Sequence, residues 1–295
     1  MNLVTVAPEV QLHVERRGVE RRHRPCVMLL HGFTGDGGTM HGLAERLETD
    51  AEVLIPDLVG HGRSSVPGDE GDYSIDSMAA HIAAVGEGCA SGSMAANVAS
   101  VGEGSASDPF HLVGYSMGGR VALTLACRRP ELLRSLTVIG ASAGLTTEAE
   151  RAERRESDQK LAESIEQDGL EAFVDRWMAN PLFATQARLG EGFLAASRAQ
   201  RLRNSAAGLT KSLRAAGTGV MTPLHDGLKS CPVPTVFVVG AQDPKFTWIA
   251  VELAARMPEA EIAVVDDAGH AAHIEQPDAV AAVVRSQMGS AQPWA

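Results

Sequence analysis

The sequence predicts an α/β fold, in which a mostly parallel, twisted sheet has helices on both faces and carries an inserted helical cap. Short apolar runs alternate with helical patterns along most of the 295 residues, and this order is typical of parallel sheets. One long stretch has helical patterns only, and it predicts the cap. Hydrophobic residues make up 44% of the chain, so a sizeable core can be buried.

Seven segments predict strands. Residues 10–14 alternate between apolar and polar side chains like a half-buried strand, whereas residues 26–30 are continuously apolar like a fully buried one. The series continues at residues 52–56, 110–113, 133–139, 235–239 and 261–265. Helical patterns lie between the strands, at about residues 39–49, 75–86, 117–128, 246–257 and 275–288.

The cap is predicted at residues 146–225, with candidate helices at 148–164, 169–178 and 192–216. This stretch lies between the strands ending near residue 139 and beginning at residue 235. We therefore expect it above the carboxyl ends of the strands, where such sheets bind ligands. Residues 1–145 and 226–295 then form the core.

Residues 85–108 are rich in Gly, Ala and Ser, and the tetrapeptide Val-Gly-Glu-Gly occurs there at residue 85 and again at residue 101. Two copies are too few for a repeat architecture. We expect a surface insertion that takes no part in the chemistry.

Composition excludes several classes of function. A net charge of −11 disfavours nucleic acid as a partner, because phosphate binding needs a basic face. The four cysteines are scattered and the ten histidines lack paired-ligand spacing, so we expect no metal and no other cofactor. No apolar stretch reaches 18 residues and the N-terminus lacks a secretion pattern, which predicts a cytoplasmic protein without membrane insertion. The oligomeric state is left open.

A G-x-S-x-G pentapeptide at residues 114–118 stands directly between a predicted strand and a predicted helix. The glycines allow a sharp turn that strains the serine backbone and raises its hydroxyl above the sheet. This context predicts Ser116 as a nucleophile or base.

A serine hydroxyl needs a histidine to take its proton and an acid to orient that histidine. Asp243 and His270 each follow a predicted strand, in the expected order of serine, acid and histidine. Asp266 and Asp267 are rival acids, although they lie close to His270 in sequence. His273 is the rival histidine, although it would begin the last helix.

Negative charge that develops on a substrate oxygen needs fixed donors. The backbone N–H of Met117, at the start of a predicted helix, supplies one donor. The N–H of Phe33, in the loop after residues 26–30, supplies the second. We expect His31 to brace that loop, and Asp57 and His61 to hold the neighbouring turn at residues 57–64.

These motifs together resemble the α/β-hydrolase superfamily over nearly the whole chain. Narrower features are similar to the 2-succinyl-6-hydroxy-2,4-cyclohexadiene-1-carboxylate synthase family of menaquinone biosynthesis. They are Tyr115, residues 118–120, residues 150–158, Trp177, residues 198–204, residues 216–219 with residues 223–224, and residues 243–246. The Gly-rich insertion and Pro244 depart from the family pattern.

The resemblance implies a lyase that eliminates pyruvate from 2-succinyl-5-enolpyruvyl-6-hydroxy-3-cyclohexene-1-carboxylate with a serine-hydrolase-like triad. The implied roles are a triad of Ser116, Asp243 and His270, an oxyanion hole of Phe33 and Met117, and substrate contacts from Tyr115, Arg120, Arg154, Trp177 and Lys245. Arginine suits a small anionic substrate with several carboxylates, because guanidinium donates two parallel hydrogen bonds to one carboxylate.

Two other functions are weighed against the lyase. A serine hydrolase, acting on an ester, a thioester or a carbon–carbon bond, would use the same triad through a covalent or gem-diol intermediate. The apolar acyl pocket of a plain carboxylesterase, however, does not need arginines such as Arg120 and Arg154. A non-catalytic binding protein is disfavoured because no triad member is missing.

Overall fold

The computed structural model describes residues 3–18, 25–90 and 108–290. Its centre is one eight-stranded sheet in the order β1-β2-β4-β3-β5-β6-β7-β8. The strands are β1 (Leu3–Ala7), β2 (Val10–Arg17), β3 (Cys26–Leu30), β4 (Glu52–Pro56), β5 (Phe110–Tyr115), β6 (Leu133–Ile139), β7 (Thr235–Gly240) and β8 (Ala260–Val265). Strand β2 is antiparallel to both of its neighbours, β1 and β4, and the other five strand pairs are parallel, so the predicted mostly parallel sheet is confirmed.

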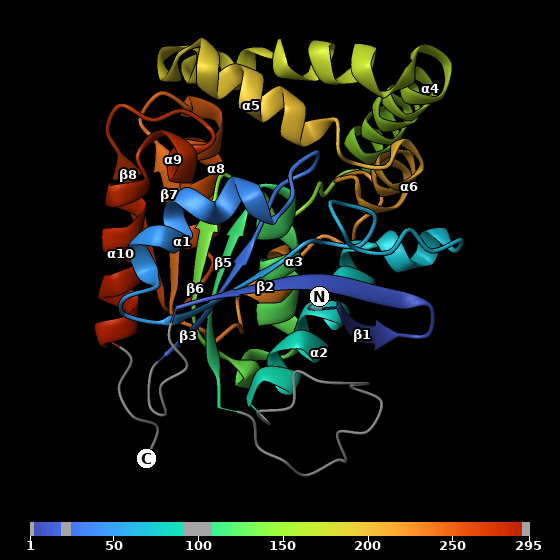
Figure 1. Cartoon of the computed structure of the whole chain (residues 1–295). Helices are drawn as coiled ribbons and strands as arrows, with labels where there is room; N and C mark the ends of the chain where they lie inside the picture. The colour runs from blue at the N-terminus through green and yellow to red at the C-terminus, as the bar shows by residue number, and fades with distance from the viewer. Residues whose placement is uncertain (1–2, 19–24, 91–107, 291–295) are drawn as a thin grey trace.

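Helices cover both faces of this sheet (Figure 1). One hydrophobic cluster packs a face of the sheet against α2 (Ile75–Ala90), α3 (Met117–Arg128) and α8 (Pro244–Ala254). A second cluster packs the other face against α1 (His41–Leu47), α9 (Ala272–Glu275) and α10 (Pro277–Ser290). Successive strand residues point to opposite faces, so each buried strand supplies both clusters. The predicted α/β fold is confirmed.

The long insertion after β6 is helical, and Figure 1 shows α4 and α5 lying across the top of the molecule, above the strand ends. Its elements are α4 (Glu148–Met178), the 3₁₀ helix η5 (Pro181–Leu189), α5 (Glu191–Arg201) and α6 (Ala206–Ala216). The side chains of α4 and α6 share a small core that includes Phe173 and Leu209. Division of the chain into a core and a cap at residues 145 and 225 stays a prediction.

The helix boundaries predicted within this insertion differ from those of the structure. The break predicted at residues 165–168, between two candidate helices, is wrong because these residues are helical, and α4 instead kinks at Gly169, which has φ 84° and ψ 165°. The single helix predicted at residues 192–216 is wrong, because the chain leaves the helix after α5. Ser205 then begins α6 by accepting a hydrogen bond from the Gly208 N–H.

Shorter elements complete the described chain. They are the 3₁₀ helices η1 (Gly37–Met40), η2 (Glu70–Tyr73) and η4 (Pro130–Leu132), and the one-turn helix α7 (His225–Leu228). Helix α2 continues to Ala90, so residues 85–90 of the predicted insertion are helical, while residues 91–107 lie outside the described residues. Across the described ranges no helix is both long and apolar enough to cross a membrane.

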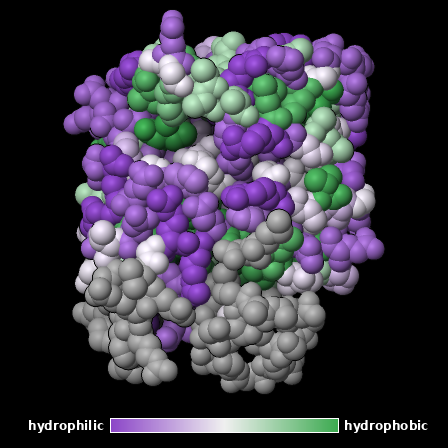
Figure 2. Space-filling view, in the orientation of Figure 1, coloured by the Kyte–Doolittle hydropathy of each residue, from purple (hydrophilic) through white to green (hydrophobic). Residues whose placement is uncertain are grey.

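Polar residues cover most of the face seen in Figure 2, and the larger apolar patches lie mainly in its upper half.

Candidate active site

Ser116 occupies a sharp turn between β5 and α3. Its backbone has φ 51° and ψ −107°, a conformation that non-glycine residues rarely adopt. Close packing makes this turn possible. A Cβ atom at Gly118 would lie 2.6 Å from the carbonyl oxygens of Leu30 and His31, and one at Gly114 would lie 2.4 Å from the Gly118 oxygen. The glycines of the pentapeptide are therefore required by sterics, and they present the Ser116 side chain at the carboxyl end of the sheet.

His270 and Asp243 stand beside this serine. His270 Nδ1 lies 2.9 Å from Asp243 Oδ2, and His270 Nε2 lies 3.4 Å from Ser116 Oγ. The carboxylate at Nδ1 fixes the proton there, which leaves Nε2 as the acceptor that faces the serine. Both side chains are almost fully buried. The 3.4 Å separation is longer than a usual hydrogen bond, as is common in active sites without substrate.

Backbone groups around His270 and Asp243 help to hold the pair in place. Asp243 also accepts a hydrogen bond from the Phe246 N–H at the start of α8, which fixes the carboxylate. Gly140, with φ 56°, leaves space for the imidazole, because a Cβ atom there would lie 2.9 Å from His270 Cε1.

The rival residues lie elsewhere. Asp266 and Asp267 are exposed, and no contact of either with His270 is found among the described residues. His273 is buried against Tyr115, with ring centroids 4.3 Å apart. The geometry thus brings together Ser116, Asp243 and His270.

Met117 and Phe33, the two residues expected to form the oxyanion hole, line the same cavity as Ser116. Met117 is the first residue of α3, where backbone N–H groups have no acceptor within the helix. Phe33 follows β3, in a loop whose next residue, Thr34, has φ 65° and is fully buried. Their shared cavity with Ser116 is what an oxyanion hole requires.

The loop that carries Phe33 is braced from two sides. The Leu58 N–H donates to His31 Nε2 at 2.9 Å, and His31 Nδ1 lies 2.9 Å from the Gly32 oxygen. Burial lowers the pKa of His31, so the ring is neutral and can serve both contacts. Asn204, from the turn between α5 and α6, donates through Nδ2 to the Thr34 oxygen at 2.8 Å.

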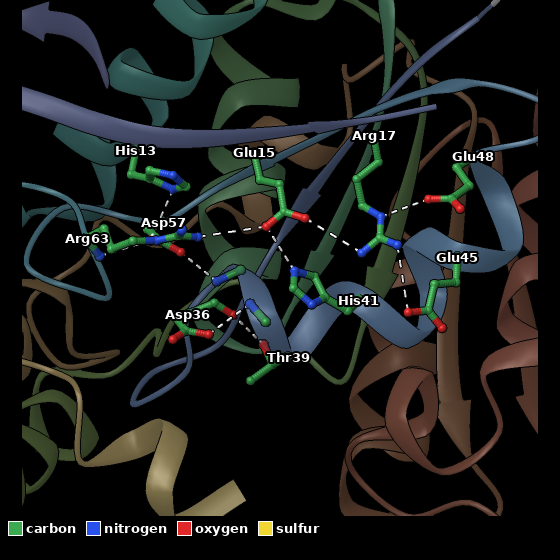
Figure 3. A network of polar contacts seen from close by, with 12 residues as sticks. His13, Glu15, Arg17, Asp36, Thr39, His41, Glu45, Glu48, Asp57 and Arg63 are labelled. Carbon is green, nitrogen blue, oxygen red and sulfur yellow. Dashed lines mark hydrogen bonds and ion pairs between the residues drawn. The ribbon is translucent and has the colours of Figure 1, made fainter. Parts of the chain in front are cut away.

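Asp57 holds the neighbouring turn. Its Oδ1 accepts from the Gly37 N–H at 2.6 Å and its Oδ2 accepts from the Arg63 N–H at 2.9 Å. Figure 3 shows Asp57 at one end of a chain of ion pairs that continues through Arg63 and Glu15 to Arg17. The side chain of Asp57 is 1% exposed, so its role here is to fix loops.

Above Ser116 and His270 lies a cavity of about 180 Å³. Nine of the ten residues proposed for the site line it, and Asp243 stands behind His270. The nine are Phe33, Tyr115, Ser116, Met117, Arg120, Arg154, Trp177, Lys245 and His270. Leu182, Phe183 and Leu213 add apolar surface to the same wall. Trp177 presents a buried indole N–H that has no partner among the described residues.

Two arginines, one lysine and one aspartate form the charged part of the cavity wall, and the arginines and the aspartate lie together. Asp158 is buried and accepts from Arg154 Nε at 2.8 and 2.9 Å, and Arg154 Nη2 lies 2.8 Å from Asp158 Oδ1. Burial, with the nearby Arg154 charge, lowers the pKa of Arg120 to about 10. Arg120 is thus still charged at neutral pH, and its guanidinium donates to the Ala216 oxygen.

Sequence reasoning gave no role to Asp158, although the spacing of four residues from Arg154 is that of an ion pair on one helix face. It also missed Phe183 and Ser212, which line the cavity from η5 and α6. No local pattern marks these two, because their position depends on how the insertion folds over the sheet.

Comparisons with known proteins agree with this geometry. Residues 25–277 match the family model described as alpha/beta hydrolase fold. A 2-succinyl-6-hydroxy-2,4-cyclohexadiene-1-carboxylate synthase from Enterobacter sp. (strain 638) is 35% identical over 88% of this chain and 89% of its own length. The synthase of that name from Salmonella typhimurium (strain LT2) is 32% identical over 88% of this chain and 94% of its own. The solved structure of MenH from S. aureus superposes with a TM-score of 0.85 at 29% identity, covering 95% of this chain and 99% of that one.

Proposed function

This chain belongs to the 2-succinyl-6-hydroxy-2,4-cyclohexadiene-1-carboxylate synthase family of α/β hydrolases, and from that premise we propose how its cavity performs the reaction. The protein is an enzyme of menaquinone biosynthesis with lyase activity. We propose that it eliminates pyruvate from 2-succinyl-5-enolpyruvyl-6-hydroxy-3-cyclohexene-1-carboxylate. No cofactor is needed for this step, and the cytoplasmic location expected from the sequence stays a prediction.

The proposed reaction is a base-catalysed elimination. The Ser116 hydroxyl gives its own proton to His270 Nε2 while Oγ takes a proton from a ring carbon, so the serine ends the step protonated and the imidazole charged. The backbone N–H groups of Phe33 and Met117 stabilise the enolate-like negative charge that the electron pair left on the ring produces. This electron pair then forms the new ring double bond as the carbon–oxygen bond to the enolpyruvyl group breaks. The departing enolate takes the proton back from His270 and leaves as pyruvate.

One observation carries this proposal: Arg120 and Arg154 line the same cavity as Ser116. Their guanidinium groups suit a substrate with several carboxylates and are of no use to a plain acyl group. Asp158 contacts Nε and Nη2 of Arg154. The Nη1 group, which Asp158 does not contact, can then donate to a substrate carboxylate.

Pyruvate release tests the proposal directly. The purified protein is mixed with the enolpyruvyl cyclohexene precursor, and pyruvate is measured with a coupled dehydrogenase. We expect turnover that falls by about 10³ or more in Ser116→Ala and in His270→Ala, because the base is lost. A variant that kept a tenth of the wild-type rate would contradict the assignment of that residue.

A p-nitrophenyl ester separates the lyase from a serine hydrolase, which would use the same three side chains. Proton abstraction needs no acyl-enzyme, so we expect little burst of nitrophenol. A rapid stoichiometric burst, followed by efficient deacylation and without pyruvate release from the precursor, would favour the hydrolase.

A further inference from the structure

Glu275 is a buried carboxylate that takes no part in the proton transfers of the proposed elimination. It is the last residue of α9, and its side chain is 1% exposed. Its Oε1 accepts from Thr185 Oγ1 at 3.0 Å, and its Oε2 accepts from Arg188 Nη2 at 2.7 Å and from the Gly269 N–H at 3.1 Å. Burying a carboxylate is costly unless it is paired and hydrogen-bonded, and these three donors meet both conditions.

The three donors come from two parts of the molecule that are far apart in sequence. Thr185 and Arg188 belong to η5 of the insertion, whereas Gly269 immediately precedes His270 in the core. Figure 1 shows α9 at the end of the core that lies under the insertion. The approach is close, because a Cβ atom at Gly269 would overlap Thr185 Oγ1. Glu275 therefore joins η5 to the loop that carries His270.

The element that Glu275 holds is part of the active-site wall. Helix η5 is a 3₁₀ helix of nine residues, and 3₁₀ helices longer than three or four residues are uncommon because their hydrogen-bond geometry is poor. Side chains three residues apart share a face of such a helix, so Leu182, Thr185 and Arg188 lie on one side. Leu182 and Phe183 line the cavity, and the ring centroids of Phe183 and His270 are 6.2 Å apart. The buried carboxylate thus fixes an apolar wall beside the imidazole.

We propose that Glu275 is a positioning residue for the elimination, and this proposal rests on the function proposed above. Through the two side chains of η5, Glu275 holds the apolar wall over the substrate. Through the Gly269 N–H, it holds His270 in place for proton transfer with Ser116. The first role concerns substrate binding and the second concerns the chemical step, so variants can separate them.

Variants on the η5 side should raise KM about three- to tenfold and leave kcat within about twofold, because the wall binds substrate and transition state alike. Thr185→Val removes one donor at equal size, and Arg188→Met removes the charged donor. Thr185→Ser keeps the hydroxyl and should restore the wild-type KM. Arg176→Met is the matched control, because Arg176 pairs with Asp168 within the insertion and does not line the cavity.

Variants of Glu275 itself test both roles. Glu275→Leu removes the acceptor on both sides, and should lower kcat about tenfold and raise KM about tenfold. Glu275→Gln can still accept from Arg188 and Gly269 through its amide oxygen, while its NH₂ group donates to the Thr185 hydroxyl. It should therefore keep kcat within about threefold of wild type. Loss of stability to urea in these variants, with kcat and KM of the folded protein unchanged, would overturn the proposal.

Hydrogen exchange of the full-length protein without substrate tests the contact independently of turnover. In Arg188→Met and in Thr185→Val, the amides of residues 182–189 should exchange about tenfold faster than in wild type, because η5 is held less firmly. Exchange in η5 at the wild-type rate in both variants would overturn the proposal, even if Glu275→Leu failed to fold. A wild-type protein that released no pyruvate would refute the proposed function instead, and the exchange rates would still report whether the carboxylate holds η5.

Discussion

Ser116 and Arg120 are four residues apart, at the start of α3, yet their predicted roles have different bases. The serine follows from a strand, a pentapeptide and a helix, because only that context tolerates its strained backbone. No local sequence pattern marks Arg120 as a substrate-binding residue, and only the resemblance to the synthase family implies that role. The structure places both on one cavity wall, since residues at this spacing share a helix face.

At Arg120 and Arg154, replacement by Lys should reduce kcat/KM by an amount equivalent to about 1.5 to 3 kcal/mol of transition-state binding. Lysine keeps the charge but loses the planar guanidinium, which at Arg154 binds Asp158 through Nε and Nη2 and leaves Nη1 for the substrate. Steady-state kinetics with the precursor measure the effect. Arg155→Lys is the matched control, because Arg155 is on the same helix but does not line the cavity. Unchanged kinetics at either predicted position would remove that arginine from the substrate site.

Among the elements, the turn between α5 and α6 links the insertion to the core. Asn204 is 5% exposed, and its amide bonds the Thr34 oxygen and accepts from the Gly62 N–H at 2.9 Å. Removing it leaves buried backbone groups unpaired in the loop that carries Phe33.

Asn204→Ala should therefore lower the free energy of unfolding by about 2 kcal/mol and reduce kcat about tenfold. Urea unfolding and pyruvate release measure the two effects. Ser205→Ala, which removes only the cap of α6, should cost about 1 kcal/mol and leave kcat unchanged. If Asn204→Ala lowered the free energy of unfolding but left kcat unchanged, the Asn204 amide would hold the insertion against the core without positioning the loop that carries Phe33.

The elements that sequence reasoning recovered are those with strong local periodicity. All seven predicted strands are present. The interruption between α5 and α6 was missed because no Gly or Pro marks it. It depends on the contacts of Asn204 with residues far away in sequence.

At the scale of the molecule, the α/β class was predictable because the order of strands and helices is encoded along the chain. Strand β1 was not, since a five-residue edge strand takes its register from its partner rather than from its own pattern. A cavity of about 410 Å³ lined by residues 38–42, 193–203 and 273–274 could not be predicted either, because these three stretches are distant in sequence.

Buried histidines make the stability of the whole molecule depend on pH. Burial lowers the pKa of His61 to about 3 and that of His111 to about 4, while both titrate near 6.5 in the unfolded chain. Between those values the unfolded chain binds more protons, so stability is complete above pH 6.5 and falls as pH drops toward 4.

Each of these two histidines should lower the free energy of unfolding by about 2 kcal/mol at pH 5 relative to pH 7, as measured by urea unfolding. His111→Gln should remove about that much of the difference between the two pH values. His41→Gln, at a side chain that is 39% exposed, serves as the control. A difference that His111→Gln left unchanged would assign the acid sensitivity to other groups.

The position of the join between α2 and β5 has a practical consequence. Helix α2 ends at Ala90 and β5 begins at Phe110, whereas Ser116 follows the opposite end of that strand. Six strand residues span roughly 20 Å. A reporter domain or affinity tag spliced into this join would therefore sit a full strand length away from the reacting atoms.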